Sequence, residues 1–104
     1  HDWLILNTID GIGIDKIEIS THHFKGNFPS HCSLQATFLS SKNSKKIFSS
    51  SNKWKYLLKN MKLSANKTHV VKNSLMKKEK INHIRINIFP DGGISRFRIF
   101  GKKI

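Results

Sequence analysis

The chain has one cysteine, no long apolar run and few acidic residues, and each shortage excludes a class of protein. A single cysteine in 104 residues cannot form an internal disulfide or a zinc site built from cysteine pairs. No run approaches the roughly 18 to 20 apolar residues that a membrane-spanning helix needs. No charged segment followed by an apolar core opens the chain either. We therefore expect a small protein without a membrane anchor in a reducing cytoplasm.

Acidic side chains number only 6, against 19 lysines and arginines. These acids include no obvious pair for acid–base catalysis, and the serines include no Gly-x-Ser-x-Gly elbow. Spacing alone therefore identifies no hydrolytic chemistry. Asp91, within the sequence Pro-Asp-Gly-Gly of residues 90–93, is most simply a turn former, with a functional carboxylate as the alternative.

The net charge of +13 and a pI near 10.3 point first to nucleic acid or to an anionic membrane surface. However, the chain is rich in lysine, isoleucine and asparagine, which have A/T-rich codons, so genome composition alone can produce this excess. The lysines also lie mainly in two loops rather than along one stripe. We therefore favour a compositionally biased surface and keep a polyanion-binding module as the alternative. A carbohydrate-binding module rests on fold analogy alone and ranks last.

Short alternating segments separated by glycine and asparagine turns predict one small all-β domain, a sandwich or a barrel. An apolar run at residues 3–6 ends at a turn signal at residues 10–13. Residues 17–21 and 32–38 alternate as half-buried strands. Cys32 lies in the core-facing series of the second strand, so we expect it to be inert packing rather than a nucleophile.

Two segments rich in lysine, residues 40–53 and 72–80, are predicted to be flexible basic loops. Between them we expect one helical turn that includes Trp54, Leu57 and Leu58, followed by a short strand at residues 69–71.

The segment 81–101 holds two alternating runs around residues 90–93, which predicts a β-hairpin with a loop of about four residues. In the register that satisfies both faces, one face is apolar and the other is polar. The polar face carries His83, Arg85, Asn87, Arg96 and Arg98. Arg85 would then lie opposite Arg98, and this pair would need a carboxylate, a carbonyl cluster or a bound anion nearby. A one-residue bulge would flip part of this pattern.

The histidines offer only a weak metal site. His22 and His23 are adjacent, and neighbours on a strand point to opposite faces, so both cannot bind one metal without a bend. We expect most of the histidines to be solvent or turn residues.

Two long stretches resemble the allantoicase family: THHFKGNFP at residues 21–29 and IRINIFPDGGISRFRIFG at residues 84–101. Shorter matches are HDW at residues 1–3, CSLQA at residues 32–36, and Trp54 with the two leucines that follow it. The resemblance implies a jelly-roll β-sandwich of the galactose-binding type. The chain then corresponds to most of one repeat over residues 1–104, more similar to the second repeat of the family. Because it begins at His1 rather than at methionine, we expect the repeat to be incomplete at its N-terminus.

Two positions depart from the family pattern. The family usually has aspartate where this chain has Ser20, and commonly alanine where it has His22. The first departure removes a candidate carboxylate from the motif.

Allantoicases hydrolyse allantoate to ureidoglycolate and urea in purine degradation, and the resemblance implies this activity. It also implies a second repeat in the full chain and a homo-oligomer, and it makes nucleic acid an unexpected partner. No cofactor is indicated with certainty. The family resemblance allows an activating divalent metal, although no ligand set in this sequence identifies one.

Allantoate carries a carboxylate and two ureido groups, which arginine, asparagine and histidine side chains can recognise. The resemblance therefore suggests these substrate-binding residues: Lys25, Asn27, Arg85, Asn87, Arg96 and Arg98. The expected catalytic residues are His23, His83 and Asp91, with either histidine giving a proton to the leaving urea. The alternative is that Gly26, Asn27, Pro90, Gly92 and Gly93 only set turn geometry.

Overall fold

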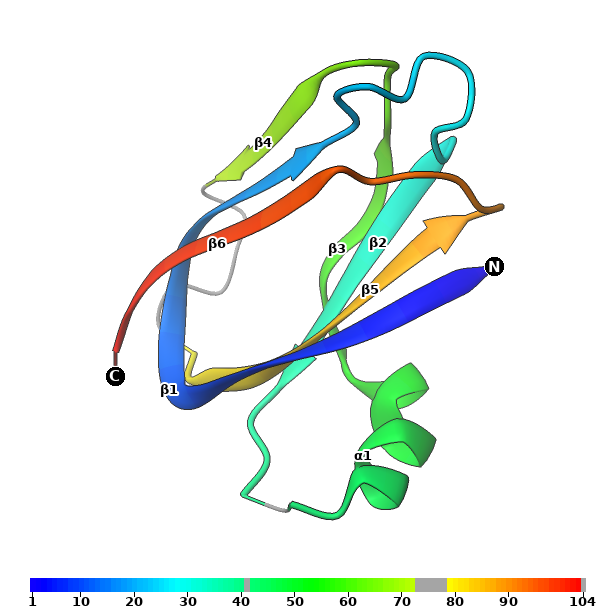
Figure 1. Cartoon of the computed structure of the whole chain (residues 1–104). Coiled ribbons are helices and arrows are strands. Elements are labelled where there is room, and N and C mark those ends of the chain that lie inside the picture. Colours follow the sequence, from blue (N-terminus) through cyan, green and yellow to red (C-terminus); the bar gives the residue numbers. More distant parts are fainter. Residues whose placement is uncertain (41, 73–78, 104) are drawn as a thin grey trace.

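The computed structural model describes residues 1–40, 42–72 and 79–103 (Figure 1). Within these residues the chain forms antiparallel strands, one short α-helix and one 3-10 turn. In chain order they are β1 (Asp2–Ser20), β2 (His31–Thr37), α1 (Ser44–Ser50), η1 (Ser51–Lys53), β3 (Lys55–Lys62), β4 (Thr68–Lys72), β5 (Ile81–Phe89) and β6 (Arg96–Lys103). The all-β prediction is confirmed. No helix of the described part of the chain is long and apolar enough to cross a membrane.

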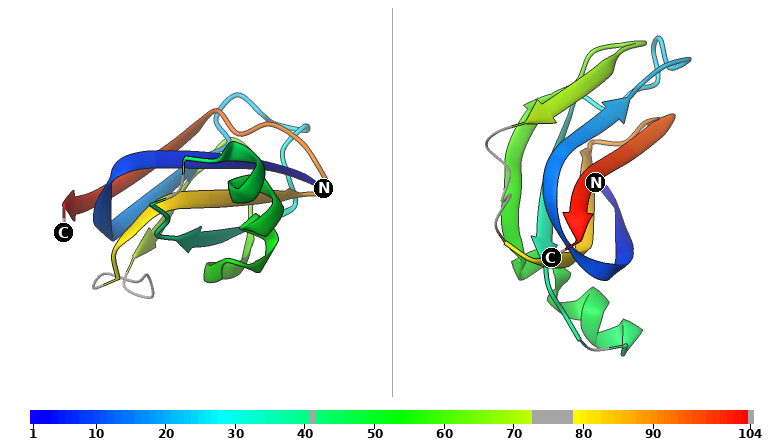
Figure 2. Two further views of the ribbon diagram at one scale, coloured as in Figure 1. Left: turned by 90° about the horizontal axis from the view of Figure 1, so that it is seen from below. Right: turned by 90° about the vertical axis from the view of Figure 1, so that its left-hand side faces the viewer.

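The long strand β1 joins the two layers of a curled sheet (Figures 1 and 2). Its first half pairs with β5, and its second half lies between β4 and β6. Between the two halves the register shifts from Asn7 to Ile12, and Ile9 adopts a positive φ of 68°. β1 therefore bends here and passes from a layer ordered β3–β2–β5–β1 to a layer ordered β4–β1–β6.

The core lies between these two layers. Its fully buried side chains come from the second half of β1, from β2 and from β5, and they include Ile14, Ile17, Ile19, Cys32, Leu34 and Ile84. Burying one such aliphatic side chain contributes about 1.5–3 kcal/mol. The alternation predicted for residues 17–21 and 32–38 is confirmed on the core side as far as Ala36, and Cys32 packs within the core as expected. Phe38 was expected to face the core as well, but it lies beyond the end of β2 and is exposed.

Of three local predictions, two were wrong or only partly right and one is confirmed. The turn signal at residues 10–13 lies inside β1, where it overlaps the register shift between Asn7 and Ile12, and the strand does not end there. The helical turn predicted around Trp54 and Leu57 is wrong: Trp54 follows the 3-10 turn η1, and Leu57 lies in β3 and faces the core. The short strand predicted at residues 69–71 is confirmed as β4.

The predicted flexible loop at residues 40–53 contains α1 and η1. Asn43 caps the helix, because its Oδ1 accepts a hydrogen bond from the backbone N–H of Lys46 at 3.3 Å. Ile47 and Ser51 are buried, so this polar segment packs onto the sheet. Most of the other predicted loop, residues 72–80, lies outside the described residues.

The predicted β5–β6 hairpin is wrong. β5 pairs with β1 and β2, whereas β6 pairs with the second half of β1 in the other layer, where Arg96 lies opposite Ser20 and Arg98 lies opposite Glu18. The segment between the strands therefore crosses from one layer to the other. Alternation fixed the faces of each strand correctly, but it carries no information about which strand is the partner. As a result the three arginines do not share a face.

The two loops that carry the family motifs pack against each other at one end of the sandwich. The backbone N–H of Gly93 donates to the carbonyl of Asn27 at 2.9 Å, and the N–H of Ser95 donates to the carbonyl of Ser20 at 2.9 Å. Gly92 has a φ of 123°, and a Cβ there would lie 2.6 Å from the carbonyl carbon of Phe28. Glycine is therefore required at this position, both for the backbone conformation and for the close approach.

The thiol of Cys32 should be chemically inert in the folded protein. Burial raises the pKa of Cys32 to about 11, and the thiolate is the reactive form. We expect iodoacetamide at about pH 8 to leave the native chain unmodified and to alkylate it fully in denaturant, as measured by intact mass. The control Val70→Cys adds a thiol at an exposed position and should be labelled once in the native state. Labelling of Cys32 in the native protein would contradict the prediction.

Candidate functional site

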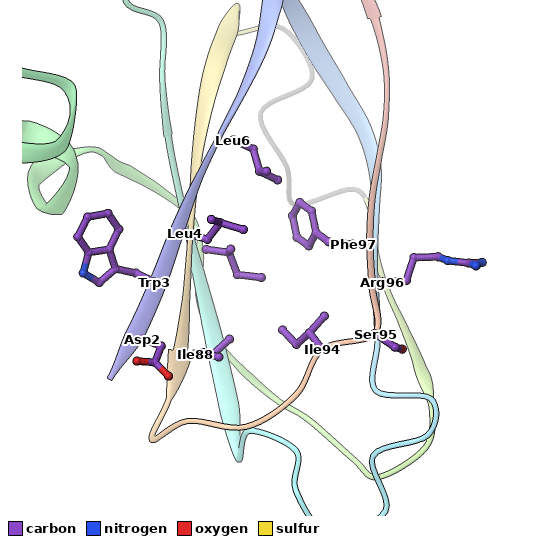
Figure 3. Close-up of a pocket in the computed structure, with 10 residues that line it drawn as sticks. Asp2, Trp3, Leu4, Leu6, Ile88, Ile94, Ser95, Arg96 and Phe97 are labelled. Carbon is purple, nitrogen blue, oxygen red and sulfur yellow. The ribbon is translucent and has the colours of Figure 1, made fainter. Parts of the chain in front are cut away.

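Two polar clusters lie on opposite outer faces of the sandwich. The first, here called the His–Arg pocket, has a volume of about 380 Å³ and is lined by Ser20, His22, His23, Thr68, Ser95 and Arg96. The second, here called the Arg85 cluster, consists of Ser33, Gln35, Ser51, Arg85 and Asn87. In Figure 3, Arg96 and Trp3, whose ring contacts Arg85, point away from the interior in opposite directions.

A third cavity, of about 400 Å³, lies between the layers and is mostly apolar. Five aliphatic or aromatic side chains point into it in Figure 3: Leu4, Leu6, Ile88, Ile94 and Phe97. Asp2, Ser95 and Arg96 also belong to the lining, and Arg96 points away from the interior. The side chains that point into the cavity offer no group for acid–base or nucleophilic chemistry, so we look for functional residues on the two outer faces.

The floor of the His–Arg pocket is formed where three neighbouring strands begin or end. Ser20 closes β1, and its register partners are Thr68 on β4 and Arg96 on β6. The hydroxyl oxygens of Ser20 and Thr68 are hydrogen-bonded at 2.7 Å. Because the three residues occupy one row across the sheet, their side chains face the same side.

Two adjacent histidines form the wall of this pocket, and they differ in how they are held. The ring of His22 is fixed by Thr68 Oγ1 at 3.0 Å and by Asn66 Oδ1 at 3.4 Å. His23 has a positive φ of 73°, and its backbone N–H donates to the same Asn66 Oδ1 at 3.1 Å. The ring nitrogens of His23 have no hydrogen-bond partner among the described residues, so this ring remains available to a ligand.

Arg96 is exposed at the edge of the pocket. Within residues 1–40, 42–72 and 79–103, no carboxylate lies within ion-pair distance of its guanidinium. A guanidinium of this kind can bind a carboxylate through two parallel N–H donors. In the same described residues, no group of three or more histidine, cysteine, aspartate or glutamate side chains could hold a metal ion.

The Arg85 cluster is a hydrogen-bonded network on the outer face of β2 and β5. Asn87 Oδ1 accepts from Arg85 Nε at 2.8 Å, and Asn87 Nδ2 donates to Ser33 Oγ at 3.1 Å and to Gln35 Oε1 at 3.0 Å. Gln35 in turn donates to the backbone carbonyl of Trp54 at 3.1 Å. The amide of Asn87 is therefore fully used inside the protein, and its role is to position Arg85.

Arg85 is only 7% exposed, and its neighbours are neutral. Nη1 donates to Ser51 Oγ at 2.7 Å, and the guanidinium carbon lies 4.3 Å from the centre of a ring of Trp3. Burial lowers the pKa of Arg85, and the phenol of Tyr56 partly opposes this shift. No carboxylate among the described residues pairs with Arg85. Leaving a buried charge without its partner typically costs about 3–5 kcal/mol.

His83 lies beside this network but is 3% exposed. Its Nδ1 is 2.7 Å from Asn82 Oδ1, and its ring meets the ring of Trp54 edge-on at 5.9 Å between centres. Desolvation lowers the pKa of His83. The side chain is therefore a neutral buried group that a substrate cannot reach in this conformation.

The structure divides the predicted site residues among several places. His23 and Arg96 meet in the His–Arg pocket, whereas Arg85 and Asn87 meet in the Arg85 cluster, next to His83. Three more are exposed in the two packed loops: Lys25, Asn27 and Asp91. Arg98 is exposed on β6.

Sequence reasoning missed several residues of both clusters. Ser33 and Gln35 alternate with the core-facing residues of the predicted strand 32–38, but nothing in the pattern shows that this second face is buried too. Ser51 came from a segment predicted to be flexible. Thr68 was missed because a lone threonine at the start of a short strand carries no local signal.

The fold is a β-sandwich whose outer faces carry binding-competent arginines, and comparison with known proteins gives its family. A family model described as the allantoicase repeat matches residues 1–104. A probable allantoicase of Acinetobacter baumannii (strain AYE) is 46% identical over 102 residues, which are 98% of this chain and 30% of the relative. A probable allantoicase of Stutzerimonas stutzeri (strain A1501) is 38% identical over 104 residues, or 100% of this chain and 31% of the relative.

Among solved structures, allantoicase from Saccharomyces cerevisiae superposes with a TM-score of 0.76 at 27% identity, covering 97% of this chain and 27% of that one. The chain therefore belongs to the allantoicase family, and the resemblance seen in the sequence is confirmed. It spans about 30% of the length of the curated relatives it matches.

The buried His83 should make the folded state less stable in acid. Its pKa lies below the ordinary value of 6.5, so below that pH the unfolded chain binds more protons than the folded chain. Its contribution to stability is thus complete above about pH 6.5 and is lost as the pH falls below that value. His83→Gln should flatten the decline in unfolding free energy between about pH 7.5 and 5, measured by urea denaturation. The exposed control His22→Gln should keep the slope of the parent chain, and equal slopes in all three proteins would contradict the assignment.

Proposed function

We propose that this chain is one repeat of an allantoicase and that the His–Arg pocket binds allantoate for hydrolysis to ureidoglycolate and urea. The observation that carries the proposal is the meeting of an unpaired arginine, Arg96, with an unpaired imidazole, His23, in one polar pocket. Family membership supports the activity. A volume of about 380 Å³ also suits a small substrate, since ligand pockets commonly measure about 300–1,000 Å³.

The substrate and the pocket are chemically complementary. In this proposal the carboxylate of allantoate accepts two hydrogen bonds from Arg96, and the ureido groups face hydroxyl and imidazole groups such as those of Thr68, Ser95 and His22. The bond from the carbon that bears both ureido groups to one ureido nitrogen breaks, and the oxygen of a water molecule takes the place of that nitrogen on the carbon. The nitrogen gains a proton and leaves as urea, and the water loses a proton as its oxygen becomes the hydroxyl of ureidoglycolate. His23 is the proposed proton donor.

The neighbouring loops supply the proposed rim of the site. Lys25 and Asn27 follow His23 in the loop of residues 21–30, and Asp91 lies in the loop that is hydrogen-bonded to it. Arg85, Asn87 and His83 lie in the other cluster and have no part in this proposal. Arg98, two residues from Arg96, also has no part in it.

The complete enzyme is proposed to contain a second repeat, because this chain spans only about 30% of its relatives. We also keep a cytoplasmic location in the proposal, since the lone buried thiol of Cys32 suits a reducing compartment. The homo-oligomer and the divalent metal stay predictions.

Replacing Arg96 tests the proposed substrate site. Arg96→Ala should reduce kcat/KM for urea release from allantoate by roughly 10- to 100-fold, because hydrogen bonds to charged groups contribute about 1.5–3 kcal/mol. Activity should be measured in the 104-residue chain and in the longest natural protein that contains it. Lys102→Ala, which removes an exposed charge farther along β6, is the matched control and should keep the parent rate.

The outcomes separate the site from the activity. Parent kinetics in a folded Arg96→Ala protein would remove Arg96 from the site but leave the enzyme assignment standing. If the unmodified protein releases no urea in either form while it is folded, the proposed activity itself is wrong.

A further inference from the structure

We propose that the Arg85 cluster is a separate binding site that accepts a single carboxylate group. The inference starts from Arg85, a charged side chain more than nine-tenths buried, with no carboxylate partner among the described residues. It does not depend on the proposed activity of the His–Arg pocket.

The unused donors of Arg85 define where the ligand would bind. Nε donates to Asn87, and one N–H of Nη1 donates to Ser51. Nη2 donates to no described residue. Yet no fully buried side-chain nitrogen or oxygen of the described residues lacks a partner, so Nη2 must reach the surface. The free N–H groups of Nη1 and Nη2 can meet the two oxygens of a carboxylate.

The guanidinium is held in one orientation before any ligand arrives. Asn87 is held by Ser33 and Gln35, and Gln35 itself donates to the backbone carbonyls of Asn52 in η1 and of Trp54 just after it. One face of the guanidinium lies against Trp3 at 4.3 Å. Binding to a fixed donor avoids the entropy cost of ordering a long side chain. A buried charge needed only for packing would be served as well by a neutral side chain of similar size.

The surroundings favour a carboxylate on an apolar or aromatic carrier. Three aromatic side chains remain exposed around the cluster: Trp3 at 43%, Tyr56 at 47% and Phe48 at 53%. Phe48 meets Trp3 edge-on at 6.1 Å, and Tyr56 is close enough to influence the pKa of Arg85. The network supplies one cation and otherwise neutral groups, which matches a ligand of one negative charge. Exposed aromatic side chains around an arginine are also typical of surfaces that contribute strongly to binding.

The carboxylate has two sources with the same chemistry: a free small molecule, or an aspartate or glutamate side chain flanked by apolar residues. Benzoate is the probe for the first source, and the peptide acetyl-Phe-Asp-Phe-amide is the probe for the second. Benzamide is the neutral control for benzoate, and inorganic phosphate tests a more highly charged anion.

The test follows the Nε–H resonance of Arg85 and the indole N–H resonance of Trp3 by NMR in the 104-residue chain. We expect one of the two carboxylate probes to shift both signals to saturation, and benzamide to leave them unchanged. Arg85→Met should weaken this binding by roughly tenfold or more, whereas Arg98→Met, at an exposed arginine of the other layer, should leave it unchanged.

The outcomes decide both the site and the source. Saturation by benzoate assigns the site to free carboxylates, and saturation by the peptide alone assigns it to a polypeptide side chain. The proposal is overturned if neither probe shifts Arg85, if phosphate binds more tightly than both, or if a folded Arg85→Met protein binds as the parent does. If Arg85→Met does not fold, the resonances of the unmodified chain still decide. Binding at Arg85 that persists in Arg96→Ala separates this site from the proposed allantoate site.

Discussion

The bend in β1 is the constraint on which the rest of the structure depends. One continuous strand pairs with β5 in one layer and with β4 and β6 in the other, so the distance and angle between the layers follow from how it turns. The turn requires the β-branched Ile9 to adopt a positive φ, which costs about 1–3 kcal/mol. Strand pairing and core burial on both sides of the bend offset this cost. Trp3, in the first half of β1, and Ser20, at its end, therefore lie on opposite outer faces of the sandwich.

The local features of this fold could be predicted from the sequence, but most of the pairings between strands that are distant in the chain could not. The faces of Cys32, Leu34 and Ile84 could be predicted because a strand repeats every two residues, whichever strand lies beside it. The partner of β6 could not be predicted, because a local pattern cannot distinguish β5 from the distant second half of β1. The turn signal at residues 10–13 was read as the end of a strand. In the structure the register shifts between Asn7 and Ile12, which overlaps this signal, and the strand then continues to Ser20.

The candidate site shows the same division between local and long-range information. The resemblance drew attention to His23 and Arg96, which lie 73 residues apart in sequence numbering but line one pocket. The assumed hairpin added Arg85 to the same site, and the crossing of residues 90–95 between the layers removes it. Ser51 reaches Arg85 only because a lysine-rich segment folds into α1 and η1. That packing depends on Ile47, which is buried, whereas the neighbouring Phe48 is exposed.

The interlocked loops have a consequence for how this pocket can change in evolution. One loop carries His23 and the other leads into Arg96, and backbone hydrogen bonds from Gly93 and Ser95 hold them together. The width of the pocket is therefore set by main-chain contacts rather than by the lining side chains. Side chains on the lining can vary while the width stays constant, so new ligand chemistry can arise at this position by single substitutions. A change in ligand length, by contrast, would require coordinated changes in two segments that are distant in the gene.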